Sequence, residues 1–339
     1  MANITPPIDP DTHETPHDQP VEWWYFAGEL QVGAAPACYG FEFTIAQVTI
    51  LGQVVYNAYF AFVEPQTSTS QGSYLGYALT SSTAYSPSTN PPPEFAFVFE
   101  PNAPNDQTWR CSSTVGPGVR QYTIAAGFQT PPAAGAIPKR RSINLTLSVP
   151  TQAHAPLLHG NQGVVDFFGD RMGFYSRSRL RVLGGIEIDS NLYTLSGGTA
   201  WMDHEWGSIN LSRRWKYLNA HLDDGRDLVH YIVRKNDGSA NPIESAYVYD
   251  AGTWQPTTVT MTQIRDWHSI PIEHSFNVTT PSIANADQRP ARDDQLRQPC
   301  NWPYPSPLVF WEGYSEIERT NGTRMGSGFL EIGGRWLPQ

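Results

Sequence analysis

Apolar residues recur at every second position in one segment after another of this chain. Phe41, Phe43 and Ile45 alternate with Glu42 and Thr44, and four apolar residues between positions 143 and 149 alternate with Ser, Asn and Thr. A period of two is typical of a β-strand with one buried face. No stretch carries an apolar stripe of helical period beyond one or two turns. The sequence therefore predicts an all-β protein, a barrel or sandwich of antiparallel strands with very little helix.

Turn residues separate the segments of high β-propensity, as expected between the strands of a barrel or sandwich. Besides those above, the predicted strands are 22–31, 53–63, 95–99, 120–126, 172–183, 186–195, 214–222, 227–235, 245–250, 257–264, 308–318 and 328–332.

Composition limits what such a protein can bind. The chain has 339 residues, with 22 basic and 32 acidic side chains and a formal net charge of −10. Binders of nucleic acid need a basic surface, so this charge argues against nucleic acid as a partner and also disfavours an anionic membrane surface. Charged residues are only 16% of the chain and aromatic residues are 12%. That balance excludes disorder and coiled coil and indicates large interior surfaces lined by rings.

No segment has the length or composition of a membrane span or a leader. The longest apolar run, around 58–63, is as long as a strand, and the N-terminus lacks a basic and an apolar region. We expect no transmembrane segment and no signal peptide in this sequence, but a removed signal would leave the same N-terminus. The three cysteines, at 38, 111 and 300, form neither a disulfide framework nor a zinc cluster. Compartment and oligomeric state stay open.

Residues 214–235 form the clearest predicted hairpin, with Asp224-Gly225 as a favoured two-residue turn. With that turn, one face collects rings and hydrogen-bonding groups: Trp215, Tyr217, Asn219, His221, Leu228, His230, Ile232 and Arg234. Such a face is typical of the ligand-facing wall of a barrel. A solvent-facing sheet surface would have the same composition, and both interpretations stay open.

Ionisable residues and indoles gather in two clusters, 16–28 and 198–207. In an extended strand, Trp201, Asp203 and Glu205 point to one side, and His204 and Trp206 point to the other. A carboxyl group held among apolar rings has a raised pKa and can act as a general acid. Aromatic faces can also stabilise a developing carbocation. The clusters therefore favour proton-initiated chemistry on an alkene, although a structural network of buried polar groups would have the same residues.

Other catalytic motifs are absent or do not fit. There is no nucleophile elbow, Walker loop or dinucleotide fingerprint. A formal H-E-x-x-H match spans His13 to His17, but this zinc motif requires a helix, and Pro16 within it makes a helix there unfavourable. His159 lies in a loop-like stretch and is predicted at the surface. We expect no metal and no organic cofactor.

The two clusters also carry a resemblance. The segment 22–28 resembles the E-W-W-Y-x-x-G signature of the AttH/carotenoid 1,2-hydratase group of lipocalin-like proteins, and 201–207 resembles its W-M-D-H/R-E-x-G segment. The hairpin around 222–226 and the C-terminal segments 311–313 and 328–331 also match, so the similarity spans nearly the whole chain. The resemblance implies two calycin-type β-domains, which we place at 1–195 and 196–339, with a hydrophobic pocket at or between them. Members of the group include hydratases of carotenoids and of a prenylated isoflavonoid, and fungal enzymes that accelerate Diels–Alder closures.

Three functions are compatible with these features. The first is hydration or cyclisation of a C=C bond in an isoprenoid or polyene, with Asp203 or Glu205 as the acid and His204 or Glu22 as its orienting group or base. The second is a pericyclase that folds a linear polyene for [4+2] closure, which needs shape and a hydrogen-bond donor but no acid. The third is a non-catalytic carrier of a hydrophobic small molecule. The residues predicted to contact the substrate are Trp23, Trp24, Tyr25, Trp201, Trp206, Trp215, Tyr217, Asn219, His221, His230 and Trp311.

Overall fold

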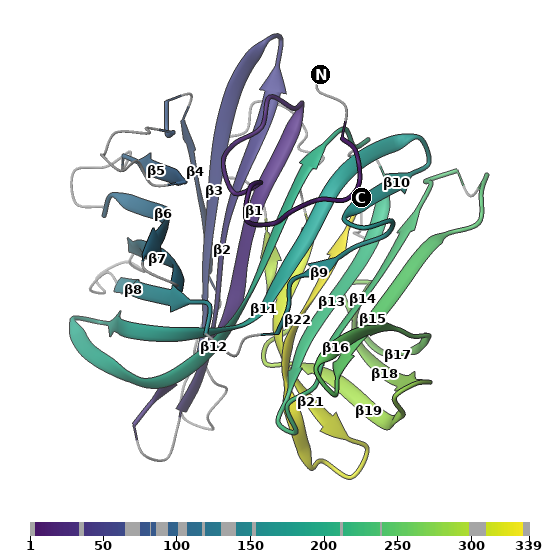
Figure 1. Cartoon of the computed structure of the whole chain (residues 1–339). Coiled ribbons are helices and arrows are strands. Elements are labelled where there is room, and N and C mark those ends of the chain that lie inside the picture. The colour runs from purple at the N-terminus through teal and green to yellow at the C-terminus, as the bar shows by residue number, and fades with distance from the viewer. Residues whose placement is uncertain are drawn as a thin grey trace. The chain divides into compact units, whose positions relative to one another are not determined.

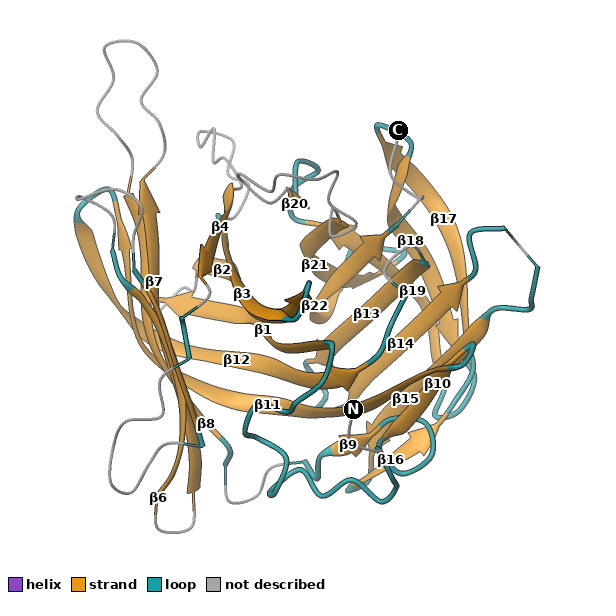
Figure 2. Ribbon diagram, turned by 90° about the horizontal axis from the view of Figure 1, so that it is seen from above, coloured by secondary structure: helices purple, strands orange, loops and turns teal. Residues whose placement is uncertain are grey.

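The protein is built from antiparallel strands. The computed structural model describes residues 4–33, 37–64, 75–81, 83–85, 94–100, 107–116, 119–129, 140–150, 154–210, 213–237, 239–297 and 310–334. Figure 2 shows these residues as strands and loops, with no helix. Within that part of the chain there is accordingly no helix with the length and hydropathy to cross a bilayer. The predicted all-β class is confirmed.

Twelve strands form the first sheet, in the order β4-β3-β2-β1-β12-β11-β8-β7-β6-β5, with β9 and β10 also pairing with β11 (Figure 1). They are β1 (Val21–Val32), β2 (Ala37–Ile50), β3 (Gln53–Val63), β4 (Leu75–Ser81), β5 (Phe95–Phe99), β6 (Trp109–Gly116), β7 (Val119–Gln129), β8 (Arg140–Ser148), β9 (Leu157–Leu158), β10 (Val164–Phe167), β11 (Asp170–Ile188) and β12 (Asn191–Gly207).

Ten strands form the second sheet, in the order β16-β15-β14-β13-β22-β21-β19-β18-β17, with β20 paired to β21. They are β13 (Arg214–Leu222), β14 (Asp227–Arg234), β15 (Ile243–Asp250), β16 (Thr253–Pro256), β17 (Val259–Trp267), β18 (Ile270–Val278), β19 (Ile283–Pro290), β20 (Leu296–Arg297), β21 (Phe310–Arg319) and β22 (Arg324–Gly333).

The chain forms two compact units. The first comprises Met1–Phe62, Tyr77–Asp166 and Arg171–Ser208, and the second comprises Val63–Gly76, Phe167–Asp170 and Ile209–Gln339. The expected division between residues 195 and 196 lies within β12, which pairs with β1 and β11 on both sides of that point. As a boundary between independently folding domains, it stays a prediction.

Pairing of β1 with β12 brings the two Trp-rich clusters together. Glu22 lies opposite Trp206, Trp24 opposite His204, and Tyr25 opposite Asp203. These residues are about 180 positions apart in sequence, yet they are direct cross-strand neighbours. Each of the two strands contributes alternate residues to the same two faces, so one face collects Glu22, Trp24 and His204.

The register of the β13–β14 hairpin differs by one residue from the prediction. His221 pairs with Asp227 and Leu218 with His230. Leu222 N–H donates to Arg226 C=O, and Gly225 lies at φ +94°, so the loop has three residues with glycine in the left-handed position. A shift of one residue exchanges the faces of a strand. The prediction that His230, Leu228 and Ile232 share a face with Trp215, Tyr217, Asn219 and His221 is therefore wrong.

Two predicted strands, 172–183 and 186–195, also divide differently. The break falls later, at Asp189 and Ser190, both of which have positive φ. The strands on its two sides are the long β11 and β12, so residues 186–188 extend the first strand and 191–195 begin the second.

Candidate functional site

A carboxyl group and two imidazoles meet on one face of the β1–β12 pair. Glu22 Oε1 lies 2.7 Å from His17 Nδ1 and 2.8 Å from His204 Nε2. Glu22 Oε2 accepts a hydrogen bond of 2.7 Å from the backbone N–H of His17. Glu22 and His204 are completely buried, and His17 is partly exposed. We call His17, Glu22 and His204 the proton-sharing triad.

Two further groups extend this hydrogen-bonded chain at its ends. Tyr175 OH lies 3.2 Å from His204 Nδ1, and His13 Nδ1 lies 2.9 Å from His17 Nε2. Each imidazole of the triad thus contacts Glu22 through one ring nitrogen and another side chain through the other. This arrangement orients both rings and runs from buried Tyr175 to partly exposed His13.

Aromatic rings surround the triad. His17 stacks on Trp206 with ring centroids 4.2 Å apart and an interplanar angle of 4°, and Trp24 stacks on His204 at 4.7 Å. A Cβ at Gly173, opposite Trp206 on β11, would lie 2.4 Å from the indole, so only glycine leaves room for that ring. The carboxyl therefore lies in an environment of rings and imidazoles.

Burial determines the protonation state of the triad. It raises the pKa of Glu22 well above its ordinary value. It lowers the pKa of His17 to about 4 and that of His204 well below its ordinary value. The favoured state is a neutral carboxylic acid between two neutral imidazoles, because each charged form loses hydration on burial. A neutral carboxylic acid can donate a proton.

A proline-rich coil before β1 supplies His13 and His17. Pro10, Pro16 and Pro20 prevent a helix, so the H-E-x-x-H match is not the zinc motif that it resembles. Gln47 of β2 holds the coil by donating to the backbone carbonyls of residues 17 and 19. The prediction that the motif is not helical is confirmed, but the interpretation as a chance match missed the role of His17.

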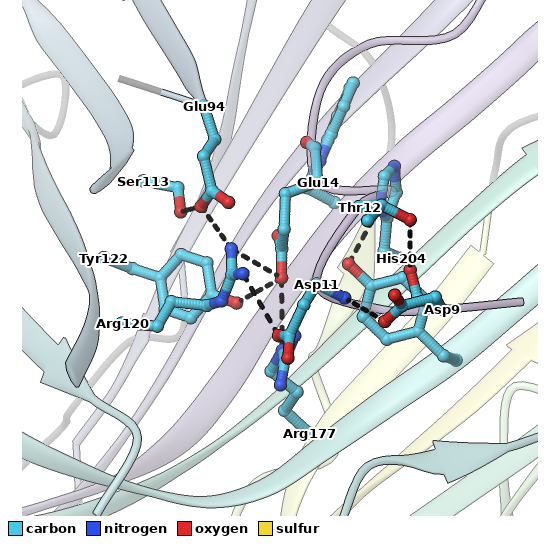
Figure 3. Close-up of polar contacts among 12 residues, drawn as sticks. Asp9, Asp11, Thr12, Glu14, Glu94, Ser113, Arg120, Tyr122, Arg177 and His204 are labelled. Atoms are coloured by element: carbon cyan, nitrogen blue, oxygen red, sulfur yellow. Dashed lines mark hydrogen bonds and ion pairs between the residues drawn. The ribbon is translucent and has the colours of Figure 1, made fainter. Parts of the chain in front are cut away.

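An ion-pair network fixes the same coil at Glu14 (Figure 3). Glu14 Oε1 accepts from Tyr122 OH at 2.9 Å and Arg177 Nε at 3.1 Å, and it lies 3.3 Å from Arg120. Asp11 pairs with both arginines as well. Glu14 and both guanidinium groups are buried, where such pairs are screened little by solvent. The network therefore positions His17, three residues further along the chain.

Two histidines and a carboxylate are also a donor set that binds zinc and similar metals. Among the described residues, the ligand atoms of His17, Glu22 and His204 all lie within 4.8 Å of one another. Two of the separations, 2.7 and 2.8 Å, are hydrogen-bond distances. Ligands about 2.0–2.1 Å from a tetrahedral zinc lie roughly 3.3 Å apart. The geometry fits a shared proton better than a metal, and the absence of a metal stays a prediction.

The opposite face of the same strand pair holds the predicted acids. Asp203 Oδ1 accepts from Trp201 Nε1 at 2.6 Å and from Ser176 Oγ, which lies 2.7 Å from His159 Nε2. His159 is fully buried and stacked on Phe174, so its predicted surface position is wrong. Its ring can be buried because Nε2 is hydrogen-bonded to Ser176 of β11.

The structure thus divides the four predicted catalytic residues between two faces. Glu22 and His204 meet directly, whereas Asp203 and Glu205 point away from them. Glu205 accepts a hydrogen bond of 3.0 Å from Trp23 Nε1, and Tyr25 pairs opposite Asp203. Among the predicted aromatic contacts, Trp24 and Trp206 pack against the triad.

The remaining predicted substrate contacts belong to the second unit. Trp311 is fully buried in its hydrophobic core, and Trp215 Nε1 donates to Glu331. His221 Nδ1 lies 2.9 Å from Asp227, and His230 Nε2 lies 2.8 Å from Glu244. Tyr217 and Asn219 are buried on the face of β13 opposite Leu218. Their role in binding a substrate stays a prediction.

Comparison with known proteins agrees with this architecture. The model of the AttH-like family matches residues 125–335. A putative AttH protein from Nitrosomonas europaea has a similar structure, with a TM-score of 0.72 and 20% identity over 98% of this chain and 99% of that one. Kievitone hydratase from Nectria haematococca has a TM-score of 0.63 and 12% identity over 98% of this chain and 94% of that one. No curated protein matches the sequence. At these identities the two solved structures show a shared fold.

Proposed function

This chain belongs to the AttH-like family, as the resemblance of its Trp-rich motifs predicted, and from that premise we propose that it is a hydratase-type enzyme with Glu22 as the general acid. The substrate is a hydrophobic molecule with a C=C bond, such as an isoprenoid or polyene. One protein of this fold, kievitone hydratase, is by name a hydratase. That likeness supports the reaction class and leaves the substrate open.

One observation carries the proposal: a fully buried carboxyl group lies between two imidazoles and against aromatic rings. Protonation of an alkene needs a carboxyl that is neutral at working pH, and burial of Glu22 favours that form. It also needs a group that stabilises the cation, and the rings of Trp24 and of Trp206, once His17 has moved away, can do so.

Each step of the reaction conserves atoms and charge. The proton of Glu22 is added to one alkene carbon, and the other carbon becomes a cation. Water attacks that cation, and His17 accepts the proton that the water loses. When the coil returns and His17 Nδ1 again lies 2.7 Å from Glu22 Oε1, the proton passes back to the carboxylate. The net change is addition of water across the double bond.

Access to Glu22 requires the coil to move. His17 covers the carboxyl with both its backbone N–H and its ring. None of residues 9–17 belongs to a strand. We therefore propose that the substrate enters when this coil moves away from Trp206. The Glu14 network then returns the coil to its position.

The test uses the full chain, a panel of prenylated phenols and linear polyenes, and heavy-isotope water. The expected result for a turned-over substrate is one solvent deuterium on carbon and one solvent oxygen in the new hydroxyl. Glu22→Gln should retain binding of that substrate and lose turnover, because the amide keeps the shape without the proton. Glu205→Gln is the matched control on the opposite face and should retain turnover.

Two outcomes contradict the proposal. A cyclised product without solvent deuterium would favour the pericyclase interpretation. A ligand returned unchanged by both the native chain and Glu22→Gln would favour the carrier.

A further inference from the structure

Lys216 of the second unit has surroundings unusual for a lysine. It lies on β13 opposite Ile232 of β14 and Ile332 of β22, and it shares a face of β13 with Leu218, which belongs to the apolar core. The side chain is partly exposed, so small molecules from solvent can reach it. Lys216 thus lies at the margin of an apolar face.

A directional chain of hydrogen bonds ends at its amine. Ser315 Oγ donates to the carbonyl of Gly313, which can only accept, at 3.1 Å. Gln288 Nε2 donates to Ser315 Oγ at 2.7 Å, so the amide oxygen of Gln288 faces His274 Nδ1, 3.4 Å away. His274 Nδ1 must therefore be the protonated nitrogen of a neutral ring.

It follows that His274 Nε2 carries a lone pair and accepts from Lys216 Nζ, 2.9 Å away. His274, Gln288 and Ser315 are almost completely buried, so the polarity of the chain is fixed by the fold. This contact orients the Lys216 amine without supplying a negative charge to its ammonium form.

The charged groups around Lys216 favour its neutral form. Burial, together with the nearby positive charge of Arg234, lowers the pKa of Lys216 to about 8, whereas Asp266 opposes the shift. Burial lowers the pKa of His274 to about 3 and also lowers that of His230, which bonds to Glu244. A lysine with a substantial neutral fraction is a nucleophile.

We propose that Lys216 is a carbonyl-reactive site that forms a reversible imine with an apolar aldehyde or ketone. The neutral Nζ attacks the carbonyl carbon, and the carbonyl electrons move to oxygen. The resulting carbinolamine loses water, and a C=N bond replaces the C=O bond. No oxidant or reductant is required. Ile232 and Ile332 select an uncharged carbon chain, and His274 is a positioning residue that orients Nζ.

The test is reductive trapping of the full chain with hexanal and cyanoborohydride, mapped by peptide mass spectrometry. Lys235, whose ammonium lies 5.3 Å from the ring centroid of Phe168, is the internal control. We expect Lys216 to be labelled about tenfold faster or more near neutral pH, with a midpoint near the pKa of about 8. Equal labelling of the two lysines, or none at Lys216, would overturn the proposal.

A second variant separates positioning from folding. His274→Phe keeps a ring but removes the acceptor, so the labelling rate at its high-pH plateau should fall at Lys216 and not at Lys235. An unchanged plateau would contradict the positioning role of His274. Glu22→Gln should leave this labelling intact, because every group involved lies in the second unit. Failure here is thus distinguishable from failure of the hydratase proposal.

Discussion

The β1–β12 pair buries a carboxyl group on each face, Glu22 on one and Asp203 on the other. Glu22 contacts imidazoles, which can both accept and donate protons. Asp203 contacts the N–H of Trp201, which only donates, and the hydroxyl of Ser176. The first set of partners lets a proton move, whereas the second holds an acceptor in place. Similar residues on one pair of strands can therefore serve chemistry on one face and architecture on the other.

The largest effect on turnover is expected when each of these two carboxyl groups is replaced in turn. Glu22→Gln should lower kcat for hydration by roughly 10²–10⁴-fold, the usual contribution of a general acid. Asp203→Asn should leave kcat close to the native value, because Asp203 points away from Glu22 and accepts hydrogen bonds from Trp201 and Ser176. Steady-state kinetics on both variants, with ligand binding as a folding control, checks this. Loss of turnover in Asp203→Asn alone would reverse the assignment.

The second prediction concerns pH. With the pKa of Glu22 raised by burial, kcat should be constant between about pH 4, below which His17 is protonated, and the pKa of Glu22, and it should fall about tenfold per pH unit above that pKa. Asp203→Asn should have the same profile as the native chain. A kcat that rises with pH over this range would contradict an acid role for Glu22.

Acidification should also destabilise the fold. His17 has its pKa lowered from 6.5 to about 4, so its neutral form is preferred in the folded state. Its contribution to stability is complete above about pH 6.5 and is lost as the pH falls through about 4. Denaturant unfolding at a series of pH values measures this. In His17→Gln the decline should be smaller, and an equal decline would assign it to other groups.

A smaller effect is expected from Ser176→Ala. The variant removes the hydroxyl that bonds to both Asp203 and His159, so the free energy of unfolding should fall by about 1–3 kcal/mol. kcat should stay unchanged, since the hydroxyl lies on the face away from Glu22. Urea unfolding and kinetics on the same preparation check both statements, and a kcat that falls with stability unchanged would move Asp203 into the chemistry.

The smallest effect is expected from metal removal. Because the triad is joined at hydrogen-bond distances, a chelator should not alter kcat. Elemental analysis and activity before and after chelation measure this. Activity that is lost and then restored by zinc would show that His17, Glu22 and His204 hold a metal.

Sequence periodicity was sufficient for the fold class and for the opposed faces of 201–207, because alternation is a local property. The pairing of β1 with β12 could not be predicted from the sequence, because it joins segments about 180 residues apart. The choice of the catalytic acid among Glu22, Asp203 and Glu205 therefore stayed open. The hairpin register was missed because Asp224-Gly225 suits loops of two and of three residues. The absence of a helix at His13–His17 could be predicted from the prolines, but a proline-rich coil can still bring two imidazoles together.

The triad draws its parts from segments with different constraints. Glu22 and His204 are fixed by strand pairing, whereas His17 lies on a coil outside the sheet. Substitutions between residues 9 and 17 can change the partner of the Glu22 proton without breaking a ladder hydrogen bond. The coil can therefore change its side chains independently of the sheet that holds Glu22 and His204.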